Sequence, residues 1–156
     1  MAKTLILYAS KYGATEKYAQ SLAQSLHADL LKTADATSEK LSAYESIIFG
    51  GGLYAGRVNG LKVLTQNWTL MQNKRVAVFL VGMTPPEASA DMVAKAIPAQ
   101  IKDHAGVFYL RGAVPYEKMG FLTKLLMKAI SKSPVSLDFV DEKALVPIIE
   151  YVTQWS

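Results

Sequence analysis

Short, nearly all-apolar runs recur along the chain and alternate with segments of helical periodicity. The two clearest runs are residues 3–9, KTLILYA, and residues 75–81, RVAVFLV. Buried parallel strands have this pattern because helices cover both of their faces. After the first run, apolar side chains continue at helical spacing as far as His27. The alternation predicts βαβ units and therefore a parallel sheet.

Further strands and helices complete this predicted order. Strands are expected at residues 29–33, 46–50 and 107–113, and helices at residues 59–71, 88–101, 116–131 and 141–155, with a short helix that begins at Ser38. Pro98 should end or kink the helix that contains it. Right-handed crossovers between parallel strands place helices on both faces of the sheet. No linker, repeat or change of composition divides the chain, so residues 1–156 are predicted to form one doubly wound α/β domain in three layers.

The composition excludes several kinds of chemistry. The 156 residues include no cysteine, so disulfides, thiolate nucleophiles, iron–sulfur clusters and thiolate zinc sites are excluded. The first apolar run is too short for a signal peptide, and no segment reaches the roughly 18 apolar residues of a membrane span. We therefore expect a cytoplasmic protein.

The chain has a modest positive charge, because 17 Lys and Arg outnumber 13 Asp and Glu for a net charge of +4. This excess could serve an anionic ligand, an acidic partner or a membrane surface. No basic run is interleaved with aromatic residues, so nucleic-acid binding is not expected. No metal site is expected, and no residue stands out as a catalytic acid or base.

The loop after the first predicted strand carries the strongest signal for a ligand. It comprises Ser10, Lys11, Tyr12, Gly13, Ala14 and Thr15. Free N–H groups and the positive end of the dipole at the start of a helix suit a phosphate dianion. The hydroxyls of Ser10 and Thr15 add donors, and Gly13 allows the backbone to turn close to the ligand. The alternative is a loop in which Ser10 or Thr15 merely caps the helix.

This spacing resembles the hydroxyl-rich loop of flavodoxins, (Ser/Thr)-x-x-Gly-x-Thr, which wraps the phosphate of FMN. The resemblance implies a flavodoxin-like fold, with five parallel strands in the order 2-1-3-4-5 and FMN outside their carboxyl ends. It also implies that two further loops flank the isoalloxazine ring. These loops contain Gly51, Gly52, Leu53, Tyr54, Ala55 and Gly56, and Gly82, Met83 and Thr84.

The first of these two flanking loops offers side chains that could meet the ring. Tyr54 could stack on it, and Arg57 could stabilise an anionic reduced flavin or an acidic group of a substrate. Its glycines allow the backbone to lie close to a flat ring. The alternative is that the glycines serve only a tight turn and Tyr54 covers the core. In the loop that begins at Gly82, backbone groups are expected to bond the polar edge of the ring.

A longer stretch, residues 3–130, resembles the menaquinone-dependent protoporphyrinogen oxidases of bacteria that have a flavodoxin-like domain. The matching segments are TLIL at 4–7, Gly50 and Gly56, GAVPY at 112–116 and LTKLLMK at 122–128. The resemblance implies an FMN-dependent oxidoreductase of heme biosynthesis that passes electrons from a porphyrinogen to a quinone. The alternatives are an electron carrier that exchanges electrons with a redox protein, and a binding module that has lost FMN.

The predicted helix 116–131 has a basic edge beside an apolar face. Lys124, Lys128 and Lys132 follow the edge, with Leu122 and Leu125 on the face. Such a surface suits anionic lipid or porphyrin carboxylates, so peripheral contact with the inner face of the membrane is one expectation. A helix that packs on the sheet and leaves its lysines in solvent would have the same pattern.

Overall fold

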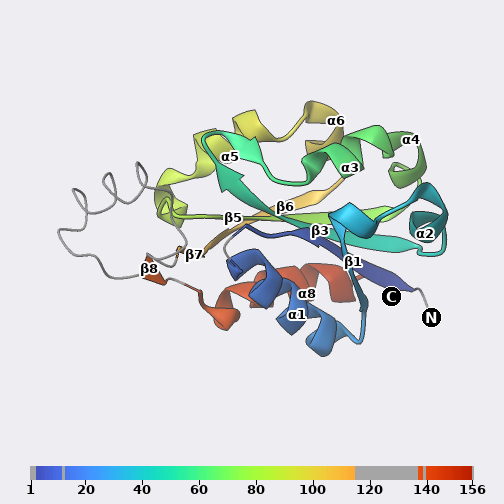
Figure 1. Cartoon of the computed structure of the whole chain (residues 1–156), viewed down its shortest axis with the longest axis horizontal. Coiled ribbons are helices and arrows are strands. Elements are labelled where there is room, and N and C mark those ends of the chain that lie inside the picture. The colour runs from blue at the N-terminus through green and yellow to red at the C-terminus, as the bar shows by residue number, and fades with distance from the viewer. Residues whose placement is uncertain (1–2, 12, 115–136, 139, 156) are drawn as a thin grey trace.

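The computed structural model describes residues 3–11, 13–114, 137–138 and 140–155. Five parallel strands form its central sheet in the spatial order β2-β1-β3-β5-β6 (Figure 1). They are β1 (Thr4–Ala9), β2 (Asp29–Lys32), β3 (Ser46–Tyr54), β5 (Arg75–Gly82) and β6 (Gly106–Arg111). A sixth strand, β4 (Arg57–Val58), is short and pairs antiparallel with the end of β3. Counted along the chain, the five parallel strands have the order 2-1-3-4-5, so the predicted doubly wound fold is confirmed.

Helices cover both faces of the sheet (Figure 1). On one face lie α1 (Ala14–Leu26) and α8 (Val146–Thr153). On the other lie α3 (Leu61–Gln66), α4 (Trp68–Met71), α5 (Ala90–Ala96) and α6 (Ala99–Lys102). The shorter elements are η1 (Thr33–Asp35), α2 (Ser38–Ser42), η2 (Pro86–Ala88), η4 (Glu142–Leu145) and the antiparallel pair β7 (Ala113–Val114) and β8 (Leu137–Asp138).

The all-apolar pattern of the strands is explained by two hydrophobic cores. Leu5 and Leu7 of β1 contact one core, whereas Ile6 and Tyr8 of the same strand contact the other. All four side chains are at most 5% exposed. Alternate side chains of a strand point to opposite faces of the sheet. A strand that lies between two helical layers therefore has no polar face.

Two predicted helices are divided in the structure. The predicted helix 88–101 is interrupted around Pro98, as expected, with α5 ending at Ala96 and α6 beginning at Ala99. The predicted helix 59–71 is divided at Asn67, whose side-chain amide donates a 2.8 Å hydrogen bond to the carbonyl of Val63. The predicted helix 116–131 lies outside the described residues.

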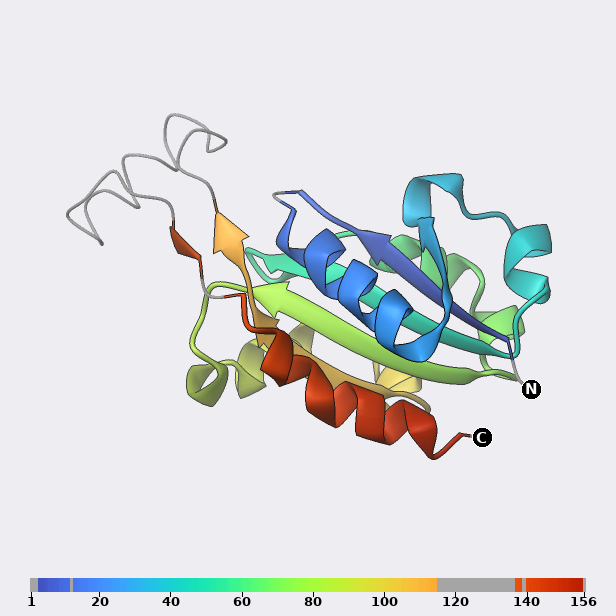
Figure 2. The same ribbon diagram turned by 90° about the horizontal axis from the view of Figure 1, so that it is seen from below.

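The parallel strands share one direction, so their carboxyl ends lie at a single edge of the sheet. Helix α1 begins at this edge, whereas α8 ends at the opposite one (Figure 2). The segments that follow β1, β3 and β5 are thereby brought to the same end of the molecule. Within the described residues, no helix is long and apolar enough to cross a membrane.

Candidate functional site

Strands β1, β3 and β5 are neighbours, so the three segments expected to bind a ligand meet at the carboxyl edge of the sheet. Ala9 is paired with Gly51, and Gly52 is paired with Val81. We call residues 10–15 the first segment, residues 51–56 the second segment and residues 82–84 the third segment. Ligands of doubly wound sheets bind at this edge.

The first segment forms an open turn that leads into helix α1. Ser10 Oγ accepts a hydrogen bond of 3.0 Å from the N–H of Gly13. Gly13 precedes the helix with a left-handed φ of 95°, a conformation that favours glycine. The N–H of Lys17 donates to the Gly13 carbonyl, so the N–H groups of Ala14, Thr15 and Glu16 have no acceptor within the helix.

Space is available above this turn. Apart from Gly13 itself and its two chain neighbours, no heavy atom of the described residues lies within 4 Å of the position that a Cβ would take on Gly13. N–H groups at the positive end of a helix of 13 residues are an arrangement that suits an anion. The geometry of the first segment therefore fits a phosphate group.

The other side chains of the first segment have different surroundings. Ala14 and Thr15 are buried, with 4% and 3% of their surface exposed, so the Thr15 side chain is withdrawn from bulk solvent. Lys11 is exposed, and its Nζ lies 5.9 Å from the centroid of the Tyr54 ring. This contact joins the first segment to the second. Tyr12 lies outside the described residues.

A cavity of about 230 Å³ opens beside the first segment, with Lys32 of β2 in its wall. The Tyr8 hydroxyl, which also lines it, donates a hydrogen bond of 2.7 Å to the carboxylate of Glu16. Burial raises the pKa of Tyr8 to about 12, with further contributions from this hydrogen bond and from the negative charges of Glu16 and Asp35. A neutral phenol therefore holds the Glu16 carboxylate near the start of α1.

The second segment is a strand and a hairpin, which corrects the loop expected from the sequence. Strand β3 does not end at Gly50 but continues through Gly51, Gly52 and Leu53 to Tyr54. The physical reason is packing. A Cβ on Gly50 would overlap the ring of Phe79, and a Cβ on Gly52 would lie 2.6 Å from a ring carbon of Tyr54. The absence of side chains here makes room for aromatic rings against the strand.

The turn of this hairpin consists of Ala55 and Gly56. Both have positive φ, 50° and 77°, which matches the right-handed twist of two-residue hairpins. Apart from Gly56 and its two chain neighbours, no heavy atom of the described part of the chain lies within 4 Å of a Cβ built on Gly56, so the turn is open. Tyr54 is paired with Arg57 across the hairpin. Tyr54 and Arg57, the two residues whose side chains are expected to meet a ring, therefore lie together at the base of the hairpin turn.

The third segment is held through its carbonyl groups by two side chains of β6. The hydroxyl of Tyr109 donates a hydrogen bond of 2.8 Å to the Thr84 carbonyl. Nη2 of Arg111 donates one of 3.0 Å to the Met83 carbonyl. Burial is the main cause of the raised pKa of Tyr109, so this phenol remains a donor. Neither side chain is among the residues predicted from the sequence, although an arginine that ends an otherwise apolar strand is an available signal.

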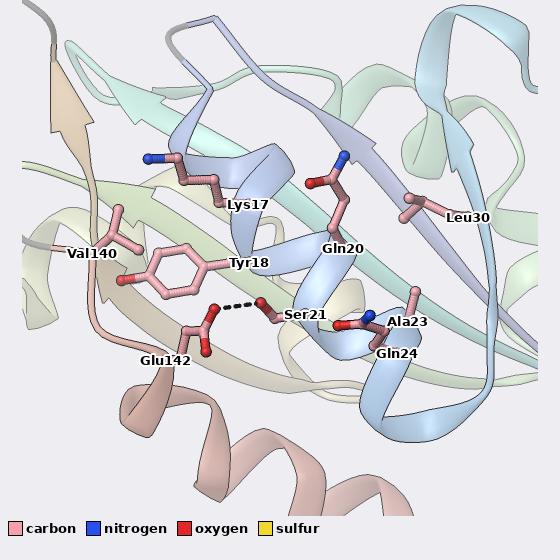
Figure 3. Close-up of a pocket in the computed structure, with 9 residues that line it drawn as sticks. All are labelled: Lys17, Tyr18, Gln20, Ser21, Ala23, Gln24, Leu30, Val140 and Glu142. Atoms are coloured by element: carbon pink, nitrogen blue, oxygen red, sulfur yellow. Dashed lines mark hydrogen bonds between the residues drawn. The ribbon is translucent and has the colours of Figure 1, made fainter.

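A second cavity, of about 600 Å³, lies along the outer side of α1 (Figure 3). It is lined by Lys17, Tyr18, Gln20, Ser21, Ala23, Gln24, Leu30, Val140 and Glu142. At its edge the Ser21 hydroxyl donates a hydrogen bond of 2.9 Å to the Glu142 carboxylate. None of the site residues predicted from the sequence lines this cavity. The carboxyl edge of the sheet is the stronger candidate because three segments and the start of α1 converge there.

Comparison with known proteins agrees with the observed fold. A family model described as a flavodoxin domain matches residues 5–135. A flavodoxin from the domain Archaea is similar with a TM-score of 0.54 and 16% identity, over 82% of this chain and 92% of that chain. Oxidised Flavodoxin 2 from Bacillus cereus has a TM-score of 0.53 and 24% identity, over 70% and 84% of the two chains.

A further solved structure with this fold is the Trp repressor binding protein from Bacillus subtilis. Its TM-score is 0.54 at 17% identity, over 70% of this chain and 83% of that chain. At these identities, structural similarity establishes the fold. A search of curated protein sequences finds no match.

Proposed function

Because the chain belongs to the flavodoxin domain family, we propose that it binds FMN at the carboxyl edge of its sheet and transfers electrons through that cofactor. The observation that carries this proposal is the open turn at Gly13. The first N–H groups of α1 have no helical acceptor there, and beyond its two chain neighbours no described atom lies within 4 Å of a Cβ built on Gly13.

Each of the three segments has a role in this proposal. Ser10 and the first N–H groups of α1 would hold the phosphate, since the Ser10 oxygen accepts from Gly13 and its O–H remains available to donate. Tyr54 would cover a face of the ring. The backbone of Met83 and Thr84 would meet the polar edge of the ring. Bound FMN supplies the electron or hydride transfer, and the protein supplies orientation and electrostatics.

Titration with FMN and with riboflavin tests the cofactor assignment. We expect the fluorescence of FMN to be quenched in a saturable manner as it binds the protein. Riboflavin should bind more weakly, because it lacks the phosphate. Ser10→Ala should weaken FMN binding roughly tenfold and leave riboflavin binding unchanged, since a hydrogen bond to a charged group is lost. Ser38→Ala on α2 is the matched control and should bind both flavins as the wild type does. Equal affinity for FMN and riboflavin would contradict the proposal.

The reaction we propose is that of an FMN-dependent oxidoreductase resembling the protoporphyrinogen oxidases, which would pass electrons from an organic substrate through FMN to a quinone. The sequence resemblance over residues 3–130 supports this assignment. The net charge of +4 also supports it, because a porphyrinogen carries carboxylates. Much of the resemblance after Val114 lies outside the described residues, so this part of the proposal depends on the sequence.

The second candidate is an electron carrier, which the fold similarity to flavodoxins favours. The discriminating assay follows porphyrinogen oxidation by the FMN-loaded protein, with and without a menaquinone analogue. Electron exchange with a flavoprotein reductase is measured in parallel. Turnover that requires the quinone supports the oxidase, whereas rapid exchange without turnover supports the carrier.

Peripheral membrane contact is proposed for the predicted helix 116–131, which lies outside the described residues. Lys124→Glu with Lys128→Glu should reduce co-sedimentation with vesicles that contain phosphatidylserine, because the attraction to anionic lipid falls. Lys62→Glu with Lys95→Glu, on α3 and α5, changes the net charge equally and serves as the control. An equal effect of the two pairs would show that only net charge matters.

A further inference from the structure

Arg111 connects the end of β6 to the third segment. It is the last residue of its strand and is paired with Gly82 of β5. Its side chain reaches past that pairing, and Nη2 donates a hydrogen bond of 3.0 Å to the carbonyl of Met83. The guanidinium group is charged at every accessible pH. A permanent cation is thus half-buried at the edge where the three segments meet.

This hydrogen bond orients one peptide group. The peptide between Met83 and Thr84 is trans, because the described residues contain no cis peptide bond. A trans peptide directs its C=O and its N–H in opposite directions. With the Met83 carbonyl aimed at Arg111, the N–H of Thr84 points away from Arg111. The next residue, Pro85, has no N–H, so Thr84 supplies the last backbone donor of this segment.

Neighbouring contacts keep Arg111 and the third segment in place. The carbonyl of Arg111 accepts a 2.6 Å hydrogen bond from the hydroxyl of Tyr18. The N–H of Gly112 donates one of 2.9 Å to the Gly82 carbonyl. On the other side, Tyr109 holds the Thr84 carbonyl, and a Cβ on Gly82 would lie 2.7 Å from the Tyr109 hydroxyl oxygen. The peptide that Arg111 orients is therefore anchored at both ends.

We infer that Arg111 is a positioning residue for the Met83–Thr84 peptide and that its cation makes the site prefer reduced FMN over oxidised FMN. The inference rests on the proposed function. Uptake of two electrons and one proton adds one negative charge to FMN. A fixed cation and an oriented N–H at this edge stabilise that added charge more than they stabilise the neutral oxidised ring.

The test compares two quantities for each variant, the affinity for oxidised FMN and the midpoint potential of the bound flavin relative to free FMN. The shift of the midpoint potential gives the ratio of affinities for reduced and oxidised cofactor, and with the affinity for oxidised FMN it also gives the affinity for reduced FMN. Reduction is carried out anaerobically with dithionite. Arg111→Gln removes the charge and keeps a side-chain donor, and it should lower this ratio about 10-fold or more, the scale of one hydrogen bond to a charged group. Arg111→Lys keeps the charge and should restore most of the ratio.

Two further variants separate charge from position. Arg75→Gln removes an equal charge from the opposite end of β5 and should leave the ratio unchanged. Tyr109→Phe releases the Thr84 carbonyl without a change of charge, so it should weaken the binding of both oxidised and reduced FMN and leave the ratio of the two affinities unchanged.

If Arg111→Gln and Arg75→Gln give the same ratio within twofold, the inference is wrong. Failure of the wild type to bind FMN would instead overturn the proposed function. If Arg111→Gln does not fold, the test depends on Arg111→Lys, which keeps the charge. A ratio of affinities 10-fold below that of the wild type in Arg111→Lys then overturns the inference.

Discussion

The phenolic hydroxyl of Tyr18 donates a hydrogen bond of 2.6 Å to the carbonyl oxygen of Arg111 and accepts one of 3.0 Å from the N–H of Asp141. Tyr18 is fully buried on α1, and Arg111 ends β6. One side chain thus ties the helix that begins at the proposed phosphate site to the strand whose side chains hold the third segment. The relative position of the two parts depends on this bond.

Replacement of Tyr18 by Phe should lower the free energy of unfolding by about 1–3 kcal/mol, because two backbone groups lose a partly buried hydrogen-bond partner. Urea unfolding followed by circular dichroism measures the change. Tyr44→Phe is the control, since the Tyr44 hydroxyl bonds to Asp29 at an exposed position where water replaces the lost partner. A larger loss for Tyr44→Phe than for Tyr18→Phe would contradict the role of Tyr18.

Gly50→Ala should be strongly destabilising, because the added Cβ would overlap the Phe79 ring. Overpacking of a buried site costs about 1–3 kcal/mol or more. The pair Gly50→Ala with Phe79→Leu should lose less stability than the sum of the two single changes, because the smaller side chain leaves room for the new methyl group. Thermal or urea unfolding of all four proteins measures the coupling. Strict additivity would mean that Phe79 is not what excludes a side chain at position 50.

Thr15→Val tests the buried hydroxyl of the first segment while keeping its volume. If this hydroxyl donates to the phosphate, FMN affinity should fall by about 1–3 kcal/mol and riboflavin affinity should not change. Thr65→Val on α3 is the control, because the Thr65 hydroxyl bonds to the Lys62 carbonyl at an exposed position. Fluorescence titration measures the affinity of each variant for FMN and for riboflavin. A loss of stability without a loss of FMN affinity would assign Thr15 a purely structural role.

Tyr8 makes the stability of the protein depend on alkaline pH. Its pKa rises from 10.0 to about 12 on folding, through burial, the hydrogen bond to Glu16 and the charges of Glu16 and Asp35. Between these two values the folded chain keeps a proton that the unfolded chain releases, so stability falls as pH rises through this range. Tyr8→Phe should show a shallower decline, measured by urea unfolding at several pH values. Glu16→Gln should lower the pKa of Tyr8 but leave it above 10.0, because burial is the largest cause. A decline in Tyr8→Phe as steep as in the wild type would contradict this assignment.

The buried parallel strands and the turn of the first segment are predictable because they depend on signals that act within a few residues, whereas the strand order was expected from the resemblance to flavodoxins. The nearly all-apolar runs of β1 and β5 identify buried parallel strands, and chain chirality then limits how they connect. Gly13 and Ser10 form a turn from their own backbone and side chain, three residues apart. The break around Pro98 follows from the chemistry of one residue.

The rest of the site could not be predicted from the sequence, because it depends on contacts between residues that are far apart in the chain. Gly50, Gly51 and Gly52 have the composition of a loop, but they lie in β3. The space that a side chain would need is taken at Gly50 by the ring of Phe79 from β5, and at Gly51 by the Asn59 carbonyl. The Arg111 side chain donates a hydrogen bond to the Met83 carbonyl, 28 residues away in the sequence. Tyr18 bonds to a carbonyl 93 residues away.

The sequence by itself therefore determined where the buried strands begin and which turn opens the first helix, and from this turn it predicts a phosphate site. Only the tertiary structure decided which side chains orient the third segment and which glycines make room for rings. Periodicity and turn chemistry are properties of adjacent residues. Contacts across the sheet exist only after the parallel strands have taken their order and brought distant residues together.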